Sequence, residues 1–176
     1  MKIINKEWKN MKQKNPKYWR NITLFLLITV MLMIISLNFL LCKIEGESMY
    51  PTLQNEEYIL VNRAGAAIFP LRHGEIVIIK NPNDPKYYVK RIIGLPKDKV
   101  KIENDILYIN GKEKKENYIY KDLSNKSKYL ANFEEREVPS NKLFVMGDNR
   151  YHSKDSRNGL GYIDRSSIVG TIIYQF

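Results

Sequence analysis

The first candidate for chemistry is a serine in the short segment 45–53, which reads Glu-Gly-Glu-Ser-Met-Tyr-Pro-Thr-Leu. Gly46 permits a tight backbone bend, and Pro51 favours an extended conformation of Tyr50. The bend presents Ser48 on a constrained loop, where its hydroxyl becomes a nucleophile if a neighbouring base accepts the proton. A turn serine beside two exposed carboxylates is the alternative, and this segment alone favours the turn.

The second candidate is a lysine inside the apolar run 87–93. A strand period places Lys90 on the same face as Tyr88 and Ile92, and lysines are rarely buried without a reason. Burial disfavours the charged amine, and moving its pKa from about 10.4 to about 7 costs about 4.6 kcal/mol, which a buried site can supply. An edge-strand lysine whose amine reaches water is the alternative, and it is the better interpretation of this segment alone.

The segment 147–161 is dense in hydrogen-bonding side chains and directly follows an apolar run typical of a strand. Ser153 can hold a catalytic lysine by accepting a hydrogen bond from its amine. The segment also supplies carboxylates and guanidinium groups that can pair with one another or with the arginine next to Lys90. These charged candidates are Asp148, Arg150, Asp155, Arg157 and Arg91. Taken alone, the segment is better interpreted as a turn-rich loop with surface ion pairs.

Metal and disulfide chemistry find little support in the sequence. The two histidines, His73 and His152, are too few and too isolated to form a metal site, and no Asp or Glu residues have metal-ligand spacing. Cys42 is the single cysteine, so no intramolecular disulfide can form. We therefore expect no metal or other cofactor, and surface or turn positions for both histidines.

The elements that must position these residues are short β-strands. Runs of β-branched and aromatic residues bounded by turn signals predict strands at 58–61, 75–79, 87–93, 107–109, 143–146 and 168–174. No segment after residue 43 has a long helical period. The polar stretch 112–137 is predicted to be a solvated loop or a weakly ordered insertion.

A run of 20 residues without a charge, 22–41, precedes these segments, and 16 of its residues are apolar. As a helix it is about 30 Å long, the thickness of the hydrocarbon core of a bilayer. The run is longer than the apolar region of a secretory signal peptide, and no pair of small residues for cleavage stands at its end. The bulky Leu41 before Cys42 also argues against a lipoprotein signal. The sequence predicts an uncleaved transmembrane signal anchor at 21–42.

The positive charge of the chain is concentrated before this anchor. Residues 1–20 contain seven basic residues and one acidic residue, which gives +6 of the total net charge of +10. By the positive-inside rule, 1–20 is a cytoplasmic basic segment of a single-pass protein of the cell membrane, and 43–176 is an extracytoplasmic domain. Most of the excess positive charge therefore serves to orient the protein in the membrane, and we expect no nucleic-acid partner. The 134 residues after the anchor suffice for one domain.

The motifs 48–53, 88–96 and 147–157, in this order, resemble the motif boxes of type I bacterial signal peptidases, and 73–78 resembles the strand between them. Gly46 resembles the Gram-positive members of that family, and a lysine in place of the histidine base of the eukaryotic and spore-associated branch favours the bacterial type. The resemblance implies a membrane-bound serine endopeptidase that removes N-terminal signal peptides from exported preproteins after small-x-small sites. It also implies a mainly β fold, with a compact antiparallel signal-peptidase/LexA-like catalytic core and a small cap insertion at about 97–142.

The resemblance assigns a role to each candidate residue. Ser48 is the nucleophile of a Ser/Lys dyad, Lys90 is the general base, and Ser153 orients the lysine. Asp155 and Arg157 form a supporting ion pair. Further supporting positions are Asp148, Arg150 and Arg91. The backbone N–H of Ser48 would be one oxyanion donor.

The substrate is expected to bind as an extended strand beside the Lys90 strand or the loop before Ser48. The predicted substrate-binding residues are Ile44, Met49, Leu53, Tyr88 and Val89. The expected partners are preprotein signal peptides and the lipid bilayer, and the chain is expected to work as a monomer.

Two alternatives from other classes stay open. A catalytically inactive, membrane-anchored homologue would keep the β core and act as a binding module. A self-cleaving LexA-like regulator would share the Ser/Lys chemistry, but it would need a DNA-binding helix-turn-helix and a cytoplasmic location. The N-terminal segment 1–20 is too short for such a DNA-binding unit.

Overall fold

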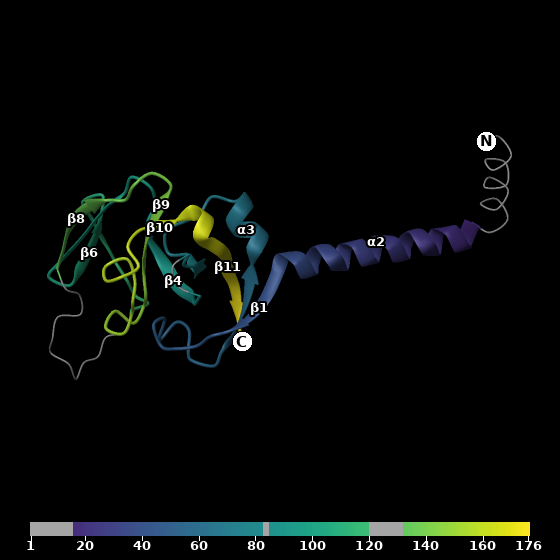
Figure 1. Ribbon diagram of the computed structural model, residues 1–176, viewed down its shortest axis with the longest axis horizontal. Helices are drawn as coiled ribbons and strands as arrows, with labels where there is room; N and C mark the ends of the chain where they lie inside the picture. The colour runs from purple at the N-terminus through teal and green to yellow at the C-terminus, as the bar shows by residue number, and fades with distance from the viewer. Residues whose placement is uncertain (1–15, 83–84, 120–131) are drawn as a thin grey trace. The chain divides into compact units, whose positions relative to one another are not determined.

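The computed structural model describes residues 16–82, 85–119 and 132–176. The chain divides into two units, Met1–Asn38 and Phe39–Phe176, and each is described by itself. The first contains the helix α2 (Pro16–Asn38), and the second contains all the strands (Figure 1). Most of the basic residues in the predicted cytoplasmic segment lie outside the described residues, whereas Lys17 and Arg20 belong to α2.

The helix α2 is long and apolar enough to cross a membrane by its length and composition. Its 23 residues correspond to about 35 Å. The four polar side chains of the uncharged run 22–41 each donate a hydrogen bond to a backbone carbonyl of the helix itself. These bonds join Thr23 to Trp19, Thr29 to Leu26, Ser36 to Met33 and Asn38 to Ile34. The predicted helical span is wrong at its end, because Phe39 already begins a strand.

The main sheet has seven strands in the order β1-β2-β11-β3-β4-β9-β10, and every neighbouring pair is antiparallel. This confirms the predicted mainly β, antiparallel fold. The strands are β1 (Phe39–Lys43), β2 (Tyr58–Asn62), β3 (Ile76–Lys80), β4 (Tyr87–Gly94), β9 (Lys142–Met146), β10 (Ile163–Asp164) and β11 (Ile168–Gln175). A short helix, α3 (Arg63–Ile68), follows β2, and the 3-10 turn η1 (Arg165–Ser167) follows β10.

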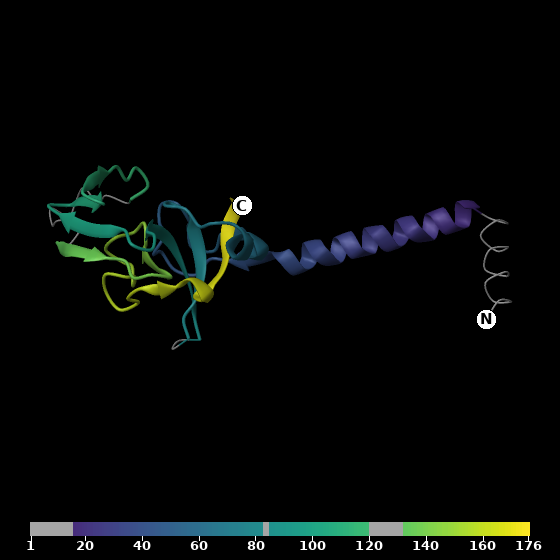
Figure 2. The ribbon, with the colours of Figure 1, turned by 90° about the horizontal axis from the view of Figure 1, so that it is seen from above.

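A second, four-stranded antiparallel sheet is inserted between β4 and β9 in the order β7-β6-β5-β8. Its strands are β5 (Lys99–Glu103), β6 (Ile106–Ile109), β7 (Lys112–Lys114) and β8 (Phe133–Glu137). In both views it lies at one end of the strand-bearing unit, with α3 and β11 at the other (Figure 1 and Figure 2). The predicted loop at 112–137 is therefore wrong at both of its ends, which are sheet edges with mostly charged, exposed residues. Part of that stretch, 120–131, lies outside the described residues.

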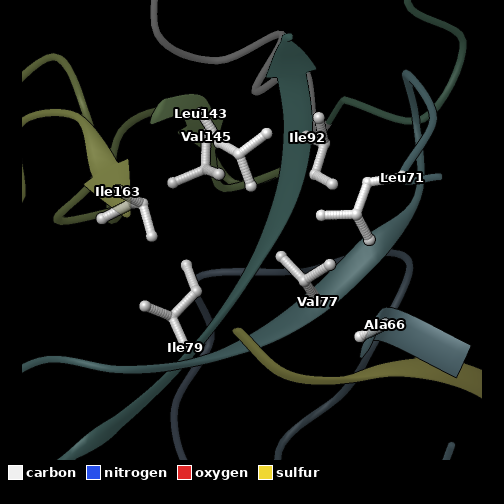
Figure 3. Close-up of a cluster of buried hydrophobic side chains, with 8 residues drawn as sticks. All are labelled: Ala66, Leu71, Val77, Ile79, Ile92, Leu143, Val145 and Ile163. Atoms are coloured by element: carbon white, nitrogen blue, oxygen red, sulfur yellow. The ribbon is translucent and has the colours of Figure 1, made fainter. Parts of the chain in front are cut away.

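Three clusters of buried side chains form the core. The first joins α3 to β3, β4, β9 and β10, and Figure 3 shows its side chains pointing into one space: Ala66, Leu71, Val77, Ile79, Ile92, Leu143, Val145 and Ile163. The second joins the two sheets: Ile93, Val100, Ile102, Leu107, Val138, Phe144 and Met146. The third lies beneath the Ser48 loop: Ile44, Met49, Leu53, Ile59, Val61 and Ile78. Because Ile92 and Ile93 belong to different clusters, β4 is packed on both faces, and its position is fixed from both sides.

Candidate active site

The loop between β1 and β2 bends sharply just before Ser48. Gly46 has a φ of +93°, a conformation that favours glycine, so the bend predicted from the sequence is present. The Gly46 N–H donates to Asn55 Oδ1 at 2.8 Å. The N–H of Tyr50 donates to the Glu47 carbonyl at 3.1 Å, and the Tyr50–Pro51 peptide bond is cis. These bonds close a turn with Ser48 near its apex.

Buried apolar residues anchor this turn. Met49 and Leu53 are 2% and 0% exposed, and the Leu53 N–H donates to the Met49 carbonyl at 3.0 Å. Both side chains belong to the third core cluster. Ser48 itself is half-buried, so its hydroxyl is held at the surface by neighbours that cannot move without opening the core.

Lys90 lies on β4 and is only 2% exposed, so it is not an edge lysine with its amine in water. Its Nζ is hydrogen-bonded to Ser48 Oγ at 2.6 Å and donates to the Val89 carbonyl at 2.8 Å. Burial lowers the pKa of Lys90 to about 8, although the charges of Asp155 and Asp148 oppose this shift. A substantial fraction of the amine is therefore neutral at neutral to mildly alkaline pH.

The loop after β9 packs directly against the Ser48 turn. Gly147 has no room for a side chain, since an added Cβ would lie 2.3 Å from Ser153 Oγ and 2.4 Å from the Ser48 carbonyl oxygen. The Asn149 N–H donates to that same carbonyl at 3.1 Å. Residues 147–149 therefore form the wall that supports the backbone of Ser48.

Ser153 is buried at 4% exposure, but the hydrogen bond expected from Lys90 is not made. Within the described ranges, Ser153 Oγ and Asn149 Oδ1 are the buried side-chain atoms without a hydrogen-bond partner. The recorded bonds of the Lys90 amine run to Ser48 and Val89 instead. Ser153 is thus at the site, pressed against Gly147, while its orienting role stays a prediction.

In the loop after β9, Asp155 forms an ion pair with Arg157, which is one of the pairings that the sequence allowed. Asp155 accepts from Arg157 Nε at 2.9 Å and Nη2 at 2.8 Å, and also from the Gly147 N–H at 3.1 Å. Burial alone would raise the pKa of the Asp155 carboxyl, but the hydrogen bonds and charge of Arg157 outweigh it and hold that pKa below its usual range. The pair therefore stays ionised and fixes the start of the loop.

Asp148, which is fully buried, pairs with Arg91, the neighbour of Lys90 on β4. Its carboxylate accepts from Arg91 Nε at 2.8 Å and Nη2 at 2.5 Å, while Arg91 Nη1 donates to the Gly74 carbonyl at 2.7 Å. Thr52 Oγ1 also donates to Asp148, at 2.5 Å. Sequence reasoning missed Thr52 as a supporting residue, although it lies in the same motif as Ser48.

Arg150 pairs with a residue that sequence reasoning did not select. Its Nη1 and Nη2 donate to the two carboxylate oxygens of Glu116 at 2.9 and 2.5 Å, and its Nε donates to the Gly147 carbonyl at 3.0 Å. Tyr118 donates its hydroxyl proton to Glu116 at 2.8 Å. Both residues follow β7 in the polar insertion, where no local pattern distinguishes them from solvated neighbours.

A groove with a volume of about 1020 Å³ contains Ser48 and Lys90. Four of the five predicted substrate-binding residues line it: Ile44, Met49, Tyr88 and Val89. Leu53 does not, and the prediction for it is wrong, because its fully buried side chain has no surface to offer a substrate. The groove also includes Ile78, from the 73–78 segment, and Cys42 and Val169, which come from strands that the motif comparison did not single out.

The two histidines lie away from the serine and lysine contacts. His73 Nε2 lies 2.6 Å from Asp98 Oδ2, which joins the loop before β3 to the turn before β5. His152 is exposed at the rim of the groove. Among the described residues, no cluster of three or more His, Cys, Asp or Glu could hold a metal ion.

The antiparallel β fold and the contact between a serine hydroxyl and a buried amine have the arrangement of a hydrolase that attacks with serine. The family model of signal peptidase, peptidase S26, matches residues 18–176. The chain belongs to this family. It is accordingly a hydrolase and a protease of the signal peptidase I type. Family membership supports the cleavage of signal peptides. The apolar helix α2 fits a membrane anchor.

The similarity extends over most of the chain. A signal peptidase I of Bacillus amyloliquefaciens is 40% identical, over 96% of this chain and 90% of that protein. Signal peptidase I T of Bacillus subtilis (strain 168) is 45% identical, over 76% of this chain and 71% of that protein. The crystal structure of a signal peptidase I from Enterococcus faecalis V583 has 30% identity and a TM-score of 0.55, and covers 60% of this chain and 99% of that one.

Proposed function

We propose that this chain is a membrane-bound serine endopeptidase that cleaves N-terminal signal peptides from exported preproteins after small-x-small sites. Ser48 is the nucleophile and Lys90 is the general base. The observation that carries the proposal is the 2.6 Å contact between Ser48 Oγ and the amine of Lys90, a residue that is only 2% exposed.

In the acylation step, neutral Lys90 accepts the Ser48 proton as Oγ attacks the scissile carbonyl. With a pKa of about 8, about a tenth of the amine is neutral at pH 7. The tetrahedral oxyanion accepts a hydrogen bond from the Ser48 N–H. The ammonium then protonates the leaving amine of the mature protein, and the signal peptide stays as an ester on Ser48. Lys90 next takes a proton from the water that attacks this ester, and it passes that proton to Ser48 Oγ as the ester bond breaks and the signal peptide is released.

The substrate binds as an extended chain along the exposed edge of β4. The β4 ladder with β9 begins at Arg91, which pairs with Met146, so the part of β4 before Arg91 pairs with no strand on that side among the described residues. A preprotein can add a strand there by backbone hydrogen bonding. The small side chains before the cut would then meet shallow pockets walled by Ile44, Met49, Tyr88 and Val89.

The supporting residues act on this geometry indirectly. Asp155 with Arg157, and Asp148 with Arg91, hold the loop 147–149 that supports Ser48. Ser153 would accept a hydrogen bond from Lys90 when the lysine changes partner during turnover. We further propose that α2 spans the cell membrane with the basic end in the cytoplasm and residues 43–176 on the outer side, and that the protein works as a monomer.

The test is cleavage of a purified preprotein with an Ala-x-Ala site by the full-length protein in detergent. Wild type should release the mature protein, whereas Ser48→Ala and Lys90→Met should release none. Ser166→Ala and Lys80→Met are matched controls at exposed positions and should cleave normally. If wild type and the two site variants give the same result, the proposal fails. A noncatalytic binding module, which family membership does not favour, would bind the preprotein without cleaving it in all five proteins.

A further inference from the structure

Glu116 makes a buried, two-pronged ion pair with Arg150. The Glu116 side chain is 5% exposed and that of Arg150 is 0% exposed. Both carboxylate oxygens accept from the guanidinium group, at 2.9 and 2.5 Å. Such paired bonds fix orientation as well as distance. Glu116 follows β7, so this contact ties the inserted sheet to the loop after β9.

Tyr118 extends the contact to a second arginine. Its hydroxyl donates to Glu116 Oε1 at 2.8 Å, and its ring centre lies 4.1 Å from the guanidinium carbon of Arg91. Burial raises the pKa of the Tyr118 phenol, so the hydroxyl remains a donor at any working pH. Glu116 and Tyr118 together therefore bridge Arg150 and Arg91.

The two arginines hold consecutive residues of the loop that supports the nucleophile. Arg150 Nε donates to the Gly147 carbonyl at 3.0 Å, and Arg91 binds the Asp148 carboxylate. The next residue, Asn149, donates its N–H to the Ser48 carbonyl. Since Gly147 has no space even for a Cβ, a shift of this loop displaces Ser48 relative to Lys90.

We propose that Glu116, with Tyr118, is a positioning residue for the reaction, through which the inserted sheet fixes the 147–149 loop and hence the Ser48 to Lys90 contact. This rests on the proposed function of that site. Glu116 acts through Arg150: without the carboxylate, a fully buried guanidinium loses its partner and must move or recruit water. The loop it holds at Gly147 moves with it.

The test compares steady-state preprotein cleavage by full-length wild type, Glu116→Ala and Glu116→Gln in detergent, well below the melting temperature of each. Glu116→Ala should lower kcat about tenfold with KM within about twofold, because the groove is intact and the reacting groups are misaligned. Glu116→Gln should lose about threefold, since its amide oxygen still accepts hydrogen bonds. Glu113→Ala, on the exposed strand β7, is the matched control and should equal wild type.

A double-mutant cycle separates positioning through Arg150 from a general loss of stability. Glu116→Ala combined with Arg150→Met should be no slower than Arg150→Met alone. Additive losses, a rise in KM without a fall in kcat, or a normal kcat at a lowered melting temperature would each overturn the positioning role. Cleavage that survives Ser48→Ala would overturn the proposed function and this role with it. A normal kcat for Glu116→Ala beside an inactive Ser48→Ala would overturn this role alone.

Discussion

Lys90 and Arg91 are neighbours on β4 and are both buried, yet their surroundings differ. Arg91 has a carboxylate partner, Asp148, with two hydrogen bonds, whereas Lys90 has no carboxylate within ion-pair distance in the described part of the chain. A buried cation with a partner stays charged and locks its surroundings in place. A buried amine without one becomes a base. One strand thus carries the proposed base, Lys90, and also Arg91, which holds the opposing loop through Asp148.

The largest effect is expected when Lys90 is given the permanent charge of its neighbour. In Lys90→Arg, the guanidinium cannot lose a proton near neutral pH, so nothing accepts the Ser48 proton. We expect kcat/KM for preprotein cleavage to fall at least about 1000-fold. Lys80→Arg, an exposed lysine on β3, is the control and should keep full activity. Retention of more than a tenth of the activity in Lys90→Arg would show that Lys90 is not the base.

The second effect is on stability, and it is expected when Arg91 loses its carboxylate partner, Asp148. Asp148→Asn leaves a buried guanidinium without its counter-charge, so the free energy of unfolding should fall by about 3 to 5 kcal/mol. Lys90→Met should leave the free energy of unfolding unchanged or raise it, because an apolar side chain replaces a buried amine that has no carboxylate partner. Asp164→Asn, whose carboxylate forms an exposed pair with Lys142, should change stability by less than about 1 kcal/mol.

The measurement for this second effect is thermal unfolding followed by circular dichroism. Tryptophan fluorescence does not report on the β unit, since the two tryptophans, Trp8 and Trp19, both precede it. Equal destabilisation by Asp148→Asn and Asp164→Asn would contradict the fastening role of the Arg91 pair. A loss of several kcal/mol in Lys90→Met would show that the amine is structural.

Part of this arrangement was predictable from the sequence. Strands with continuous β-branched and aromatic runs were found, since their residues pack on both faces. β5 was missed even though Val100 and Ile102 alternate with polar residues, a pattern that predicts a half-buried strand. β1 was missed because its apolar residues continue the apolar run of α2. β7 and β8 are edge strands with mostly exposed side chains, so their pairing is set by the sheet beside them.

The site shows a similar division. Ser48, Lys90 and the 147–157 loop stand in compact motifs, so their residue types and order were enough to select them. The partner of Arg150 was not predictable, because Glu116 is 34 residues away and no local pattern separates it from its charged neighbours. Leu53 was misassigned since an apolar residue near a nucleophile can serve as a pocket wall or as an anchor, and its burial decides for the anchor.

The smallest effect is the pH dependence of kcat/KM. It follows the protonation of the Lys90 amine, whereas Arg91 stays charged over the same pH range. Burial lowers the pKa of Lys90 to about 8, and the charged amine that predominates below this pH cannot accept the Ser48 proton. We therefore expect kcat/KM to rise about tenfold per pH unit below pH 7 and to level off above about pH 9, measured with one preprotein between pH 6 and 10. Asp148→Asn removes one of the two negative charges that hold this pKa up, so the midpoint should move to lower pH. A profile that is flat from pH 6 to 10, or a midpoint near the usual lysine pKa of about 10.4, would show that a buried Lys90 with a lowered pKa is not the base of the reaction.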